Sequence, residues 1–155
     1  MSKYDGVTHS RLKAISLEAD TATITQLNVT DSVLSTRKRF TIAQINAGAT
    51  LVAAVAGKSI RMVNCKAIAV GGAAAAVTTV DVLGTVSTSR KLVAFGQANL
   101  TQSTVLTAGG TGGTVLADGA SYTANDAGTA VTVGKTGSDV TTATHIDVIF
   151  DYVLE

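Results

Sequence analysis

The chain has 155 residues, a net charge of +1, no proline or tryptophan, and a single cysteine, Cys65. This length suits one domain with a real hydrophobic core, and one cysteine excludes an intramolecular disulfide framework. Charged residues make up 15% of the chain, well below the roughly 25% of average soluble domains. A surface with so little charge predicts that a partner covers part of it.

Membranes and nucleic acids are not expected partners. No stretch reaches the roughly 18 apolar residues of a membrane span, and the N-terminal MSKYDGVTHSRLK lacks the apolar core of a signal peptide. We therefore expect a chain made in the cytoplasm. The longest basic run, Arg37-Lys38-Arg39, is too short to neutralise a line of phosphates.

Residues 1–38 form the first predicted unit, a polar N-terminal arm or small subdomain. Residues 1–40 carry a net charge of +2, whereas the remaining 115 residues carry −1. Within the arm, a short helix is expected over residues 10–20 and an extended strand over residues 21–32. The boundary to a sparsely charged body is placed near Arg39.

Residues 39–155 are predicted to form an all-β body. Runs of β-branched residues separated by Gly, Asn, Asp and Ser favour a sandwich or barrel over alternating helices and strands. The C-terminal THIDVIFDYVLE alternates most regularly, which places Ile146, Val148, Phe150, Tyr152 and Leu154 on one face. Further strands are expected over residues 40–45, 50–56, 59–70, 76–84, 91–106, 113–117 and 129–135.

Several of these strands are apolar on both faces. Such strands need a cover on each side, from the second sheet and from something else, and a neighbouring subunit is the simplest second cover. Edge strands without proline and with few Lys or Glu also need covering. Cys65 lies in the apolar segment SIRMVNCKAIAV and is expected to be a buried, inert thiol.

Two glycine-containing stretches resemble ligand loops only in part. The segment VAAVAGKS ends like a phosphate loop, but Val52 stands at the first glycine and a strand follows, so we predict a hairpin turn with an exposed Lys58. In GGTGGT, Val115 replaces the third glycine of a dinucleotide fingerprint, and Thr114 replaces the Asp of a calcium repeat. This stretch is predicted to be a turn.

Catalytic signals are weak, and we predict no enzyme, no catalytic residue, no cofactor and no metal site. His9 and His145 have no recognisable nucleophile setting, and two isolated histidines with one cysteine give no metal-ligand spacing. Asp81, Asp147 and Asp151 would serve a glycosidase if two of them met across a sheet. Acidic residues alternating with apolar ones on a solvent-facing strand explain them more simply.

The body resembles small structural proteins of tailed bacteriophages. The resemblance covers residues 39–155, from RFTIAQINAGATLVAAVAGKSIRMVNCKAIAVGG through KLVAFGQ to TVLADGASYTANDAGTAVTVGKTGSDVTTATHIDVIFDY, and is compositional and positional rather than a tight motif. It implies a β-sandwich or jelly-roll module of the virion, commonly a homotrimer. The role it implies is capsid decoration (cement) protein or head or tail fibre component.

From this resemblance we expect a decoration protein that trimerises and binds the major capsid protein on the outer surface of the head. The polar arm would reach along the shell, with capsid-contact candidates Arg11, Lys13, Arg37, Lys38 and Arg39. The alternative is a head or tail fibre module that binds a host-surface receptor or glycan. Because glycan sites favour stacked aromatic rings, Tyr122 in the turn-rich GASYTAND is its candidate contact.

Overall fold

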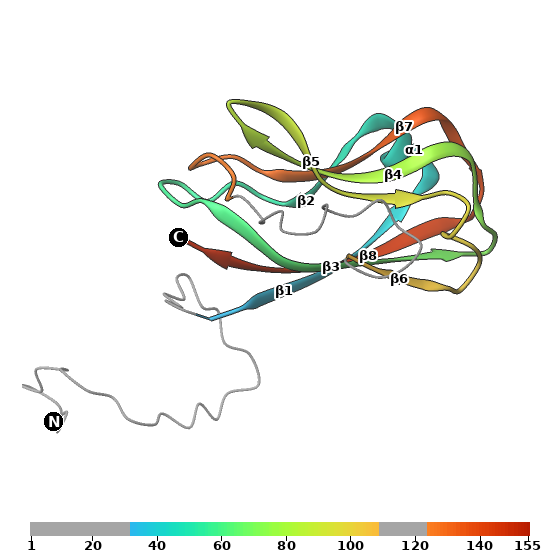
Figure 1. Cartoon of the computed structure of the whole chain (residues 1–155), viewed down its shortest axis with the longest axis horizontal. Helices are drawn as coiled ribbons and strands as arrows, with labels where there is room; N and C mark the ends of the chain where they lie inside the picture. The colour runs from blue at the N-terminus through green and yellow to red at the C-terminus, as the bar shows by residue number, and fades with distance from the viewer. Residues whose placement is uncertain (1–31, 109–123) are drawn as a thin grey trace, which may run out of the picture.

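The computed structural model describes residues 32–108 and 124–155, which form two packed β-sheets and one short helix (Figure 1). The predicted all-β sandwich is therefore confirmed. The elements in chain order are β1 (Leu34–Thr41), α1 (Ile42–Ala47), β2 (Ala49–Val52), β3 (Ile60–Val70), β4 (Ala74–Val86), β5 (Thr88–Gly96), β6 (Val105–Thr107), β7 (Val131–Thr142) and β8 (His145–Leu154).

The strand order is that of a jelly roll. Sheet A has the order β1-β8-β3-β6 and sheet B the order β2-β7-β4-β5, with every neighbouring pair antiparallel. The pairs β1 with β8, β2 with β7, β3 with β6 and β4 with β5 are nested, as in one long hairpin of four strand pairs. Rolling that hairpin brings β3 beside β8 and β4 beside β7, which gives the two-sheet jelly roll.

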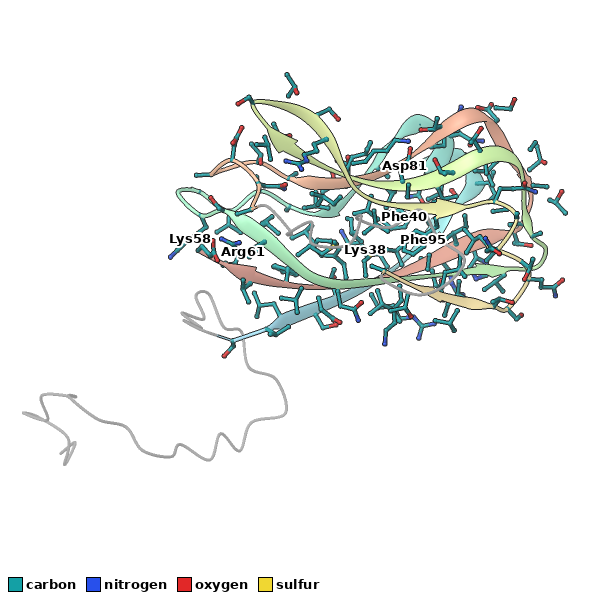
Figure 2. The ribbon with its side chains drawn as sticks, in the orientation of Figure 1. Lys38, Phe40, Lys58, Arg61, Asp81 and Phe95 are labelled. Atoms are coloured by element: carbon teal, nitrogen blue, oxygen red, sulfur yellow. The ribbon has the colours of Figure 1, made fainter. Side chains whose placement is uncertain are left out.

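The hydrophobic core fills the space between the inner faces of the two sheets. Strand β8 alternates as predicted: Ile146, Val148 and Phe150 are fully buried, while Tyr152 and Leu154 are partly buried and pack against the core. Sheet B contributes Phe95 and the valines of β4 and β7, and Figure 2 labels Phe95 between the layers. Few large aromatic rings are needed because small β-branched side chains fill the gap.

The strand predicted over residues 40–45 is wrong beyond Thr41, because α1 begins at Ile42. The backbone N–H of Gln44 donates to Thr41 Oγ1 at 3.3 Å, and the backbone N–H of Thr41 donates to Gln44 Oε1 at 2.9 Å. This is a capping box, and Gly48 with a φ of 79° ends the helix. The sequence signal was present as T-x-x-Q followed by glycine, and local capping prevailed over the apolar alternation.

Three other strand predictions were wrong in extent. The strand expected over residues 50–56 ends at Val52, and the one expected over residues 91–106 is two strands, β5 and β6. The strand expected over residues 129–135 is β7, which continues to Thr142. The turn at Gly57 and the exposed Lys58 is confirmed, with a left-handed φ of 68° at Gly57. It is not a hairpin, because β2 and β3 belong to different sheets and the turn carries the chain from one to the other (Figure 2).

The apolar residues of β5, Leu92 to Phe95, are buried within a single chain and need no neighbouring subunit, whereas Thr88 to Lys91 are exposed. The register with β4 shifts between Val82 and Leu83, where Val93 pairs with Val82 and Lys91 pairs with Leu83. Leu92 is the extra residue of this bulge, and both Leu92 and Val93 join the core. The expectation that a subunit must cover this two-sided apolar strand was therefore wrong.

The predicted boundary near Arg39 falls inside a strand. Strand β1 pairs with β8 at eight consecutive positions from Leu34 to Thr41, so residues 34–38 belong to the sandwich. The rest of the arm, with its expected helix and strand, lies outside the described residues. So do the GGTGGT stretch and the strand expected over residues 113–117.

Candidate functional site

The outer face of sheet A combines basic and aliphatic side chains in two rows that cross the sheet. In the first row, Arg37 of β1 lies beside Ile149 of β8, which lies beside Lys66 of β3. Neighbouring strands are about 4.8 Å apart, so the two basic residues start roughly 10 Å from each other on either side of Ile149. We call this the Arg37 row.

The second row lies two residues further along each strand, on the same face of the sheet. It runs from Arg39 of β1 through Asp147 of β8 and Ile68 of β3 to Val105 of β6. Ile68 is partly buried, whereas Val105 is 53% exposed. We call this the Asp147 row. The carboxylate of Asp147 lies on the central strand β8, between Arg39 and Ile68.

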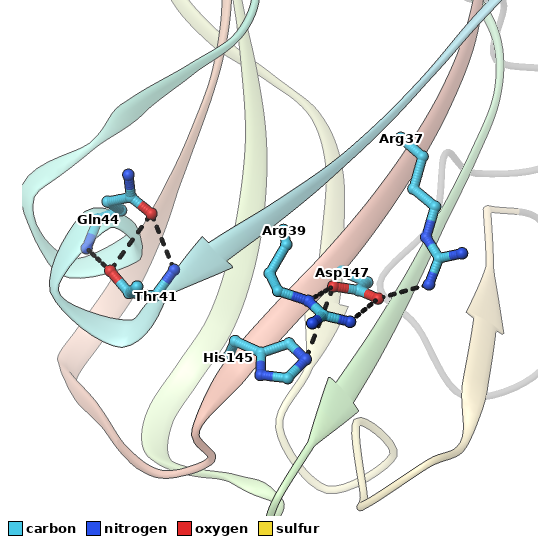
Figure 3. A network of polar contacts seen from close by, with 6 residues as sticks. All are labelled: Arg37, Arg39, Thr41, Gln44, His145 and Asp147. Carbon is cyan, nitrogen blue, oxygen red and sulfur yellow. Dashed lines mark hydrogen bonds and ion pairs between the residues drawn. The ribbon is translucent and has the colours of Figure 1, made fainter.

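Asp147 is held by two guanidinium groups (Figure 3). Arg37 donates to Oδ2 from a terminal nitrogen at 2.7 Å, and Arg39 donates from Nε to Oδ1 at 2.9 Å and from a terminal nitrogen to Oδ2 at 3.3 Å. The hydrogen bond from Arg39 leads the causes that lower the pKa of Asp147 to about 2. The Asp147 side chain is 3% exposed and each arginine side chain 63%, so the arginines cover the carboxylate and themselves face solvent.

His145 completes this cluster from the next position on the same face of β8. Its Nε2 lies 3.8 Å from Asp147 Oδ1, too far for a hydrogen bond (Figure 3). That nitrogen is buried and has no hydrogen-bond partner among the residues that the structure describes.

Lys38 has a different role from the two arginines beside it. Its side chain points from the edge of β1 toward sheet B, where Nζ donates to the backbone oxygen of Thr50 on β2 at 3.2 Å. It thereby links the edges of the two sheets (Figure 2). A lysine on an edge strand also disfavours pairing with another strand. These two structural roles account for Lys38 without a bound partner.

The outer face of sheet B is built differently. Asp81 of β4 is 1% exposed, and its Oδ2 accepts from Thr136 Oγ1 at 2.6 Å and lies 3.1 Å from Lys91 Nζ. Its Oδ1 is buried without a hydrogen-bond partner in the described part of the chain. The residues beside Asp81 across the sheet are Ala94 and Gly134. The neighbours of Asp81 across the sheet are therefore small, and the partly exposed Leu83 lies next to Gly134 on the same face.

The three aspartates do not form a carboxylate pair. Asp81 lies on the outer face of sheet B, whereas Asp147 and Asp151 lie on the outer face of sheet A. Asp147 and Asp151 are four residues apart on β8, which separates their Cα atoms by roughly 13 Å. Glycosidase pairs need carboxyl groups about 5–9.5 Å apart, so these residues do not provide one.

Three of the five predicted capsid-contact residues lie on β1, but only Arg37 and Arg39 share the outer face of sheet A, whereas Lys38 points toward sheet B. Arg11, Lys13 and the candidate receptor contact Tyr122 lie outside the described residues. Sequence reasoning missed Lys66 and Ile149 as neighbours of Arg37. Their alternation marked them as outward-facing, but which strands pair, and in which register, cannot be read from alternation alone.

Other chemical features of the described residues are few. No group of three His, Cys, Asp or Glu side chains within residues 32–108 and 124–155 is placed to hold a metal ion. The described helix, α1, has six residues, and no helix in these ranges is long and apolar enough to cross a bilayer. Cys65 is fully buried, as predicted, and burial raises the pKa of its thiol to about 12.

Comparison of the chain with models of protein families, with curated protein sequences and with solved structures gives no match. The function must therefore be inferred from the residues and the geometry of this chain.

Proposed function

We propose that this protein is a capsid decoration (cement) protein of a tailed phage, which trimerises and binds the major capsid protein on the outer surface of the head. The observation that carries the proposal is a jelly roll whose core is closed within one chain while one outer face exposes cations beside aliphatic side chains. Jelly rolls are common in viral capsid proteins, which supports the proposal by analogy of fold.

A decoration protein needs a rigid body and a binding surface, rather than a pocket. Both sheets of this body are antiparallel, and the long strands β3, β4, β7 and β8 form the two sheet centres. A trimer would present three copies of its contact face to a symmetric shell. Individually weak contacts then act together, because the second and third contacts form at a high effective concentration.

Binding to phage heads tests the proposal directly. Heads of the phage that encodes this chain, prepared without it, are mixed with the purified protein and sedimented. We expect saturable co-sedimentation at a fixed ratio to the major capsid protein, together with heads that withstand higher temperature or lower salt. Light scattering across a dilution series is expected to give the mass of a trimer. Absence of co-sedimentation would remove the proposed function.

The fibre alternative, a module that binds a host-surface receptor or glycan, has one supporting observation, since lectin domains also use jelly rolls. Its difficulty is the lack of exposed rings in residues 32–108 and 124–155. All three phenylalanines are buried, and Tyr152 packs against Phe150 with ring centroids 5.7 Å apart. A glycan array with the whole chain distinguishes this function, and binding that is lost in Tyr122→Ala would favour it.

A further inference from the structure

We propose that the outer face of sheet A is the surface by which the folded body docks on its shell partner, and that this partner presents carboxylates around an apolar contact. This inference rests on the proposed function and names which face of the jelly roll carries it. The residues concerned are those of the Arg37 row and the Asp147 row.

The charge that this face offers to a partner is positive. Asp147 is covered by the two arginines that bind it, while both guanidinium groups remain largely exposed. Arg37 binds Asp147 through one terminal nitrogen, and its guanidinium group has further N–H donors that can bind a second carboxylate. Lys66 has no ion pair within the described part of the chain. The other acidic residue of this face, Asp151, accepts a hydrogen bond from Ser35 at 2.6 Å.

An aliphatic strip runs between these cations. Ile149 and Ile68 are diagonal neighbours on β8 and β3, and Val105 lies directly opposite Ile68 on the edge strand β6. The two isoleucines are partly exposed and Val105 is more than half exposed. Contacts to this strip would exclude water from the flanking ion pairs, which strengthens them. Alternating basic and apolar side chains therefore fit an acidic protein surface with its own aliphatic contacts.

Nucleic acid fits this face less well. Phosphate binding needs a line of free cations, whereas two of the three basic side chains here are bound to Asp147 and an isoleucine separates the third from them. The outer face of sheet B fits an acidic partner less well, because Lys91, the cation beside Asp81, is already paired with that carboxylate.

A matched pair of variants tests the docking face. The test variant combines Lys66→Glu with Val105→Asp, which reverses one unpaired charge and places a carboxylate in the aliphatic strip. The control combines Arg90→Glu with Val55→Asp, which makes the same changes in charge at exposed positions on β5 and on the β2–β3 connection. Thermal melting and light scattering establish that both variants fold and keep the oligomeric state of the unchanged protein.

Affinity for phage heads is measured by co-sedimentation at about 50 mM and about 200 mM salt. We expect the test variant to bind at least about tenfold more weakly and the control to stay within about twofold of the unchanged protein. Equal binding by both variants would overturn the docking face while the proposed function stands. Failure of the unchanged protein to bind heads would instead overturn the function, and the docking face with it.

Two further outcomes would assign the face to another partner. If the test variant alone dissociates the oligomer, the outer face of sheet A is a contact between copies of this chain. If duplex DNA displaces the unchanged protein from heads, and the test variant has lost DNA binding, the face binds nucleic acid. Either result overturns the proposed docking on an acidic shell surface.

Discussion

Each sheet carries a buried aspartate in the middle of its outer face, and the two sheets compensate the buried negative charge in different ways. On sheet A, Asp147 receives three hydrogen bonds from Arg37 and Arg39, and its pKa is lowered to about 2. On sheet B, Asp81 receives one from Thr136, lies next to Lys91, and keeps one buried oxygen without a partner in the described residues. Only the first carboxylate is fully satisfied.

This difference shows which outer face has more positive charge than its buried carboxylate neutralises. Two arginines for one carboxylate leave a positive excess on sheet A, beside exposed aliphatic side chains. One lysine for one carboxylate leaves no excess charge at Asp81 on the outer face of sheet B. The arginines of sheet A stabilise their own carboxylate, and in the proposed docking only their remaining N–H donors would contact a partner.

The largest expected effect compares how much a core phenylalanine from each sheet contributes to the free energy of unfolding. Phe150→Ala on sheet A and Phe95→Ala on sheet B should each lower the free energy of unfolding by about 3–5 kcal/mol, because each removes a fully buried ring and leaves a cavity. Urea unfolding monitored by circular dichroism measures both. A large inequality would mean that the core relaxes around one of the two cavities more completely than around the other.

The next largest expected effect follows from removing the charge of Asp147. Asp147→Asn should lower the free energy of unfolding at pH 7 by about 2 kcal/mol, because the carboxylate that two guanidinium groups stabilise is gone. Thermal and urea unfolding at pH 7 are the measurements. Arg90→Gln, which changes an exposed arginine on sheet B, is the control and should change stability little.

The same variant predicts a pH dependence with a defined sign. The pKa of Asp147 is depressed in the folded state, so its contribution is complete above about pH 4 and is lost as the pH falls toward about 2. Stability of the unchanged protein should therefore fall over that range more steeply than that of Asp147→Asn. A small dependence remains in the variant, because the hydrogen bond from Arg61 also lowers the pKa of Glu155. Parallel pH profiles would contradict the role of Asp147.

A smaller effect concerns the connection between the sheets. Helix α1 carries the chain from β1 of sheet A to β2 of sheet B, and its first turn depends on the capping box of Thr41 and Gln44. Thr41→Ala should cost about 1 kcal/mol, and Thr41→Ser close to nothing, because serine keeps the acceptor oxygen. Thermal melting of the two variants side by side measures the cap.

The smallest expected effect completes the comparison of the two aspartates. Asp81→Asn should change the free energy of unfolding by less than about 1 kcal/mol, because the buried charge has one partnerless oxygen and its desolvation offsets the pairing with Lys91. Measured beside Asp147→Asn under the same conditions, it should be clearly the milder change. Equal losses would mean that Asp81 is as well satisfied as Asp147.

Much of the fold could be predicted where a strand has one clear inner face. The alternation of β8 correctly named its buried side chains, and the apolar segment around Cys65 correctly predicted a buried thiol. Predictions failed where local signals competed, as at Thr41 and Gln44, where a capping box lay within an apolar run. They also failed at β5, where a bulge turned Leu92 into the core and removed the need for an outside cover.

The candidate site was predictable only in part. Arg37 and Arg39 stood out as members of a basic triplet, but their partner Asp147 is more than a hundred residues away in sequence. Lys66 and Ile149 carried no signal beyond outward alternation. Assigning them to one surface requires the pairing of β8 with both β1 and β3, which depends on the whole rolled hairpin.

By itself, the sequence determined that this protein is an all-β sandwich with a core of small aliphatic side chains, because alternation with period two and turn residues are local properties of the chain. Only the tertiary structure decided that the strands are nested as a jelly roll, that Asp147 lies under two arginines and Asp81 under one lysine, and that cations gather on sheet A. Register and strand order arise from contacts between distant segments, and these fix which side chains share a face.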